Sequence, residues 1–155
     1  MITTGWVHGE GCSCCQRPVP LAQSLDEIAF ERSIQKAAAM GNRQRVKEII
    51  QRSPQQAYSQ DSSGYTALHY AAKCGDIEMC SWLLALQAFP VNATTKGGVS
   101  TALHRAAAAG HMEIVRLLLS YGADATKEDA EGNTAAVKAS IAGYHEIEEL
   151  LSQGK

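Results

Sequence analysis

The sequence contains no long apolar run: none of its 155 residues belongs to a stretch near the roughly 20 apolar residues that a membrane-spanning helix needs. It also has little charge imbalance, because the formal net charge is −2, so nothing global indicates nucleic-acid binding. No phosphate-binding glycine loop, G-x-S-x-G elbow or H-E-x-x-H zinc motif occurs. These absences argue against membrane-spanning, nucleic-acid-binding and common hydrolytic functions. The length predicts one domain, and a hydrophobic share of 45% suffices for a continuous core.

The cysteines are unevenly placed along the chain. The chain has five cysteines, and an odd number argues against the disulfide framework of a small secreted protein. The N-terminal residues have neither the basic region nor the apolar region of a signal peptide. We therefore expect an intracellular protein in a reducing compartment, the cytoplasm.

Two stretches of the chain repeat each other. Residues 66–75 read TALHYAAKCG and residues 101–110 read TALHRAAAAG, and an apolar helical run follows each of them. Four glycines that end small-residue segments follow one another at spacings of 34, 35 and 33 residues: Gly41, Gly75, Gly110 and Gly143. Such a period is typical of a solenoid, in which one helical unit stacks on copies of itself. It predicts a binding surface rather than a catalytic pocket.

The repeated pattern resembles the ankyrin repeat, whose pattern is T-P-L-H-x-A at a spacing near 33 residues. Ala67 and Ala102 stand where that family has Pro, and the third unit ends in the family's Gly-Ala-Asp at residues 122–124. The clustered cysteines, with residues 25–32 and 64–71, resemble one small member of the family in particular. The resemblance implies an all-α ankyrin-repeat solenoid of about four helix-turn-helix units with β-turn fingers. It further implies a protein-binding scaffold or adaptor.

We expect an irregular, cysteine-containing tail over residues 1–23 and an ankyrin-repeat domain over residues 24–155. The predicted units span about 24–57, 58–92, 93–127 and 128–155. The first and last units lack the T-x-L-H motif and are more polar, as terminal capping repeats need to be. Asp61–Gly64 and Asp129–Gly132 predict β-turns at two finger tips. The third finger, Thr94–Ser100, is longer, and its paired glycines predict a mobile tip.

The histidines of the motif are the residues that could suggest catalysis. Thr66 and Thr101 are expected to cap the first helices of their units. In ankyrin repeats the Thr and His side chains hydrogen-bond to each other, which implies that His69 and His104 are structural. His111 follows a glycine, as in the family, and is interpreted in the same way. We therefore predict no catalytic residue and no enzymatic activity.

The resemblance places a protein partner against the concave face that fingers and first helices form. Ten positions of the ankyrin pattern that vary from repeat to repeat are expected on this face: Tyr65, Tyr70, Lys73, Cys74, Ser100, Arg105, Ala108, Asn133, Lys138 and Ile141. Tyr and Arg are enriched among binding hot spots, and the cations indicate a partner segment with acidic and apolar character. Packing of Tyr70 against the next repeat is the alternative. The partner's identity is open; we expect neither nucleic acid nor membrane, and a monomer within a hetero-complex.

The tail carries a second set of candidates. Four residues of zinc-ligand type occur within eight positions: His8, Cys12, Cys14 and Cys15. No second cluster accompanies them, and Cys74 or Cys80 could complete a site only if the tail folds back. Zinc is thus a possible cofactor and otherwise none is expected; a metal- or redox-responsive regulatory protein is the alternative function. Trp6 is interpreted as an anchor that inserts into a partner or into the first repeat.

Overall fold

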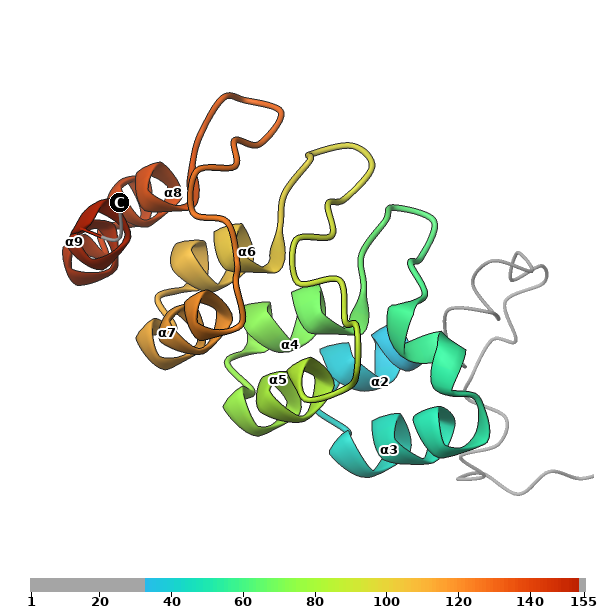
Figure 1. The fold of residues 1–155 in the computed structure, drawn as a ribbon. Coiled ribbons are helices and arrows are strands. Elements are labelled where there is room, and N and C mark those ends of the chain that lie inside the picture. Colours follow the sequence, from blue (N-terminus) through green and yellow to red (C-terminus); the bar gives the residue numbers. More distant parts are fainter. Residues whose placement is uncertain (1–32, 154–155) are drawn as a thin grey trace, which may run out of the picture.

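The computed structural model describes residues 33–153, which form a row of stacked helical hairpins (Figure 1). The helices are α2 (Ile34–Ala39), α3 (Arg43–Arg52), α4 (Ala67–Cys74), α5 (Ile77–Leu84), α6 (Ala102–Ala109), α7 (Met112–Ser120), α8 (Ala135–Ala142) and α9 (His145–Gln153), with a 3-10 helix, η1 (Pro54–Tyr58). The predicted all-α ankyrin solenoid is confirmed. Within the described range the only strand-like pairing is an isolated bridge between Glu128 and Thr134.

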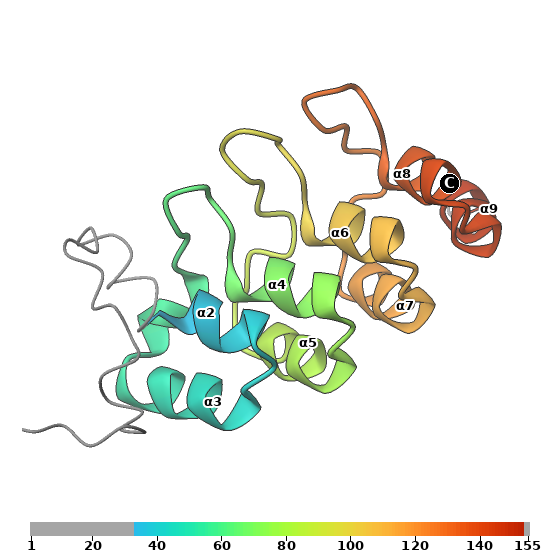
Figure 2. The same ribbon diagram turned by 180° about the vertical axis from the view of Figure 1, so that it is seen from behind.

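The inner helices α2, α4, α6 and α8 form one row, and the outer helices α3, α5, α7 and α9 form another. Three loops project beyond the inner row on the same side of the molecule, and the view from behind shows the same arrangement (Figure 2). We call these loops finger 2 (residues 60–66), finger 3 (94–101) and finger 4 (128–134). Fingers and inner helices together form what we call the inner surface.

The sequence explains where the inner helices begin and end. The Thr101 hydroxyl accepts a hydrogen bond from the His104 backbone N–H at 3.5 Å, and this caps α6. The helix ends at Gly110, whose φ of +81° is a left-handed conformation that glycine adopts without steric cost. A Cβ atom at this position would lie 2.4 Å from the ring of Tyr144, so any other residue would force that ring to move. Glycine therefore both stops the helix and lets the next hairpin pack closely.

Small residues let the inner helices approach one another. Four alanines at equivalent positions of α4 and α6 are completely buried: Ala71, Ala72, Ala106 and Ala107. Leu83 and Leu118 are equally buried between the hairpins, and each contributes about 1.5–3 kcal/mol by leaving water. These residues belong to one core that runs along the row of hairpins.

The structure confirms that the motif histidines have a structural role, and it shows a second contact that each of them makes. Nδ1 of His69 accepts a hydrogen bond from the Thr66 backbone N–H at 3.2 Å, and Nε2 lies 3.2 Å from the Ser100 carbonyl oxygen. Because Nδ1 accepts, Nε2 carries the proton and donates to that carbonyl. His104 bridges Thr101 and the Asn133 carbonyl in the same way, at 3.2 and 3.1 Å. Each histidine therefore joins the start of its own helix to the base of the next finger.

The end units follow the same frame with different residues. In the first unit, the buried Gln35 occupies the histidine position and donates to the Ser59 carbonyl at 2.9 Å. In the last unit this position is Val137, which is 42% exposed. Glu148 and Ser152 stand in α9 where α7 has Val115 and Leu119. This more polar face supports the interpretation of the fourth unit as a cap.

Backbone hydrogen bonds connect the fingers. Finger 3 donates from the Lys96 N–H to the Ser63 carbonyl at 2.9 Å, and finger 4 donates from the Ala130 N–H to the Gly98 carbonyl at 2.9 Å. The predicted turns at Asp61–Gly64 and Asp129–Gly132 are present, each closed by a hydrogen bond from the glycine N–H to the aspartate carbonyl. Mobility of the third finger stays a prediction.

The histidine bridges predict a pH-dependent stability. Burial lowers the pKa of His69 and His104 below 6.5, against the opposing effect of their hydrogen bonds to backbone groups. Unfolding therefore takes up protons at acid pH. The contribution of these histidines to the free energy of unfolding is fully present above pH 6.5, and it decreases as the pH falls from there toward the native pKa values. Denaturant titrations between neutral and mildly acid pH measure this decrease.

A double variant, His69→Gln with His104→Gln, should flatten this dependence, because glutamine does not titrate and, as Gln35 shows, can donate from the same helix position to a carbonyl beside the next finger. The control is His145→Gln, since that side chain is 80% exposed and takes no part in the bridges, so the decrease should persist in this variant. A double variant that keeps the full decrease would contradict the assignment.

Candidate functional site

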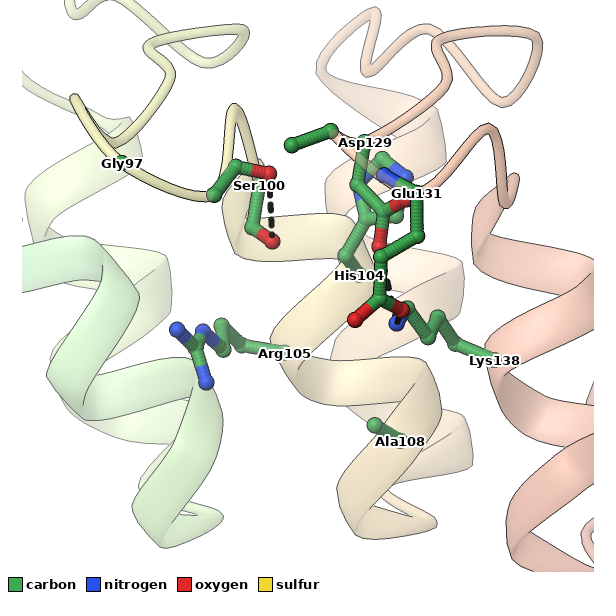
Figure 3. A pocket seen from close by; sticks show the side chains of 10 residues that line it. Gly97, Ser100, His104, Arg105, Ala108, Asp129, Glu131 and Lys138 are labelled. Carbon is green, nitrogen blue, oxygen red and sulfur yellow. Dashed lines mark hydrogen bonds and ion pairs between the residues drawn. The ribbon is translucent and has the colours of Figure 1, made fainter.

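The inner surface contains a hollow of about 400 Å³ between fingers 3 and 4 and helices α6 and α8. Figure 3 shows the side chains that surround it. Its lining combines finger backbone with inner-helix side chains: Gly97, Gly98, Ser100, His104, Arg105, Ala108, Asp129, Ala130, Glu131 and Lys138. The hollow thus lies where the ankyrin resemblance places a partner.

An aspartate in the finger fixes the side chain that faces it from the inner helix. In finger 2, Asp61 accepts hydrogen bonds from two backbone N–H groups of its own turn and, at 2.8 Å, from the hydroxyl of Tyr70. In finger 4, Asp129 accepts two equivalent backbone hydrogen bonds and pairs with the ammonium of Lys138 at 2.9 Å. Lys138 also pairs with Glu131 at 2.6 Å.

These contacts change the acidity of the groups involved. Burial acts to raise the pKa of Asp129, but hydrogen bonds from Lys138 and from its own turn outweigh it and lower that pKa to about 2. Burial is the largest of the effects that raise the pKa of Tyr70, and the hydrogen bond to Asp61 is the second. At neutral pH the finger carboxylate of Asp129 is therefore charged, and it neutralises Lys138.

Arg105 is held differently. Its guanidinium lies over the ring of Tyr65, 4.9 Å from the centroid, and donates a hydrogen bond to the Tyr65 hydroxyl. The ring of Tyr70 lies 5.4 Å from that of Tyr65, so a second aromatic ring packs beside the one that carries the cation. Its Nε atom is buried, and no acceptor among the described residues reaches it.

The structure brings together six of the residues predicted to bind a partner. Ser100, Arg105, Ala108 and Lys138 line the hollow, with Tyr65 and Tyr70 beside Arg105. The hydroxyl of Tyr70 binds Asp61 of its own unit, so this side chain has a structural role besides the packing considered as an alternative.

Four other predicted residues do not line the hollow. Lys73 and Cys74 are exposed at the end of α4. Asn133 contributes its carbonyl to the His104 bridge, and Ile141 is 72% exposed on α8. Trp6 lies outside the described residues.

Of the finger residues that line the hollow, sequence reasoning identified Ser100 but missed five others: Gly97, Gly98, Asp129, Ala130 and Glu131. A signal for some of them was present. Asp61 precedes Tyr70 by nine residues, and Asp129 precedes Lys138 by the same number. Equal spacing in a repeat protein predicts equivalent contacts, so the pairing of Lys138 could have been anticipated.

The candidate zinc ligands His8, Cys12, Cys14 and Cys15 lie outside the described residues. Within residues 33–153, no three side chains of His, Cys, Asp or Glu form a group that could hold a metal ion. Cys80 is fully buried, in register with Val115, which makes it unsuited to complete a site with the tail. No helix of the described part is long and apolar enough to cross a membrane.

Comparisons with known proteins agree with the repeat pattern. The family model described as ankyrin repeats (many copies) matches residues 34–84, and the model described as ankyrin repeats (3 copies) matches residues 86–155. The chain is 44% identical to ankyrin repeat domain-containing protein 39 of Homo sapiens over 74 residues, which are 46% of this chain and 40% of that protein. It is 46% identical to the Bos taurus protein of the same name over 65 residues, covering 40% of this chain and 35% of that protein.

A further relative is BCL-6 corepressor-like protein 1 of Homo sapiens, 36% identical over 116 residues, which are 75% of this chain and 6% of that protein. The matches span less than half the length of each of these relatives. The particular resemblance to a small ankyrin protein is confirmed by the first two.

The two described cysteines predict a contrast in thiol reactivity. Burial raises the pKa of Cys80 to about 12, whereas Cys74 is exposed. Because the thiolate is the reactive form, a maleimide should modify Cys74 in the native chain and Cys80 only after unfolding. Mass spectrometry of fragment ions locates the label, and Cys74→Ser serves as the control. Equal modification rates for the two thiols would contradict the burial of Cys80.

Proposed function

Because the chain belongs to the ankyrin-repeat family, we propose that it is a protein–protein interaction module that binds its partner through the inner surface. In this proposal it is an intracellular adaptor or structural subunit, a monomer within a larger hetero-complex. The partner is another protein whose identity is open. Residues 33–153 supply the surface, and the repeats act as its rigid support.

The hollow between fingers 3 and 4 is the observation that supports this proposal best. Its lining includes the exposed Ala108 on α6 and two charged side chains of inner helices, Arg105 and Lys138. The backbone around it is fixed by the His104 bridge and by the bond between fingers 3 and 4. A preformed surface loses little conformational entropy on binding.

Aromatic and exposed apolar side chains extend the surface beyond the hollow. Tyr65 and Tyr70 continue it toward the second unit, and Ile141 on α8 continues it toward the last unit. Large aromatic side chains contribute strongly to binding when a partner covers them. We therefore expect a partner segment that spans units two to four.

Filling the hollow tests the proposed binding face. Ala108→Arg adds a large side chain at an exposed helical position, so it should block the hollow without disturbing the core. Ser81→Arg is the matched control, because Ser81 is also exposed but lies on the outer helix α5. Proteins captured by the wild-type chain and by Ser81→Arg, but lost with Ala108→Arg, are candidate partners.

The affinity for a purified candidate should then fall at least about tenfold in Ala108→Arg, which corresponds to about 1.4 kcal/mol, and stay near the wild-type value in Ser81→Arg. Thermal unfolding of both variants checks that each is folded. A partner that binds Ala108→Arg as tightly as the wild type contacts another face, and the proposed binding mode would then be wrong.

A further inference from the structure

The repeat register shows that one inner-helix cation lacks the carboxylate that its neighbours possess. In the second unit the finger residue Asp61 binds Tyr70, and in the fourth unit Asp129 binds Lys138. Arg105 is the equivalent residue of the third unit, directly after the motif histidine. The finger position that would face it carries Thr95, whose N–H donates to the Ser100 carbonyl as that of Asp61 does to Tyr65. Thr95 lies ten residues before Arg105 rather than nine, because finger 3 is one residue longer than fingers 2 and 4.

Thr95 replaces the aspartates in their structural role but not in their charge. Its hydroxyl oxygen accepts a hydrogen bond from the Ser100 N–H at 3.1 Å, as Asp61 accepts from the N–H of Tyr65 and Asp129 from that of Asn133. Thr95 is 3% exposed and supplies no negative charge. The finger is therefore closed normally, while the guanidinium of Arg105 receives no ion-pair partner from it.

No other described residue supplies that partner. Within residues 33–153, each recorded ion pair involves a cation other than Arg105. Of the two cations that line the hollow, Lys138 is compensated twice and Arg105 is not. Figure 3 shows the guanidinium extending from α6 toward α4, away from Lys138 and Glu131.

We infer that Arg105 is the recognition site for a single acidic side chain of the partner, an Asp or Glu carboxylate within the segment that crosses the hollow. This inference rests on the proposed function and names the chemistry of the same site. Stacking on Tyr65 holds the guanidinium in place before binding, and hydrogen bonds between a guanidinium and a carboxylate are among the stronger ones in proteins.

The charges on the other side of the hollow limit what can follow that acidic residue. Asp129 and Glu131 together carry one more negative charge than Lys138 neutralises, and the side chain of Glu131 is 72% exposed. A continuous acidic run would meet repulsion there, as would a phosphate group with nearly two negative charges. The partner segment therefore carries one carboxylate at Arg105 and an uncharged or basic residue opposite Glu131.

Two substitutions at one position separate charge from shape. Thr95→Asp places a carboxylate where the neighbouring units have theirs, so it should pair with Arg105 inside the chain. Thr95→Asn has nearly the same shape and keeps an acceptor for the Ser100 N–H, but it is neutral. Thr95 does not line the hollow, so neither substitution removes a contact surface. Arg105→Gln removes the cation directly.

The probe is a phage-displayed library of random peptides, selected on the complete 155-residue chain. Peptides whose binding is lost in Ala108→Arg should share one Asp or Glu position. Their affinity should fall about tenfold or more in Thr95→Asp and in Arg105→Gln, and stay near the wild-type value in Thr95→Asn. The ion pair should also weaken as salt is added.

The outcomes distinguish this inference from the proposal on which it rests. Peptides that require an open hollow but share no acidic position, or that bind Thr95→Asp and Thr95→Asn equally, would overturn the inference and leave the binding face intact. Peptides unaffected by Ala108→Arg would count against the binding face itself, and with it the inference. A selection that yields no peptide dependent on Arg105 likewise overturns the role of this residue.

Discussion

The hydrogen bond from each motif histidine to the next finger is the constraint on which the rest of the molecule depends. His69 and His104 each join the start of an inner helix to a carbonyl in the following unit. Without that link, the alanine contacts between inner helices would set their distance but not the position of the fingers. The hollow exists because the fingers and the inner helices keep one fixed relation along the row.

On this fixed frame, small changes in sequence produce large changes in surface chemistry. Finger residues Asp61 and Asp129 neutralise or bind the side chain opposite them, and Thr95 at the same position does not. The backbone of the three fingers is nevertheless closed in a similar way. A repeat protein can therefore vary the charge of its binding surface one unit at a time, because each unit contacts only its neighbours.

Most of the fold could be predicted from the sequence, because the repeated T-A-L-H motif and the glycine period specify helix starts, helix ends and stacking together. The burial of Cys80 followed from its register with Val115. The stacking of Arg105 on Tyr65 could not be predicted, because the two residues are 40 positions apart and their contact depends on how adjacent units pack. The size of the hollow likewise depends on packing rather than on any motif.

The most direct test of the account is hydrogen exchange of the complete chain, alone and with a purified partner. If the inner surface binds, added protection should concentrate in fingers 2 to 4 and in α4, α6 and α8. The outer helices α3, α5, α7 and α9 should exchange at nearly unchanged rates. Protection confined to the outer helices, with fingers that exchange as fast as in the free chain, would contradict the account.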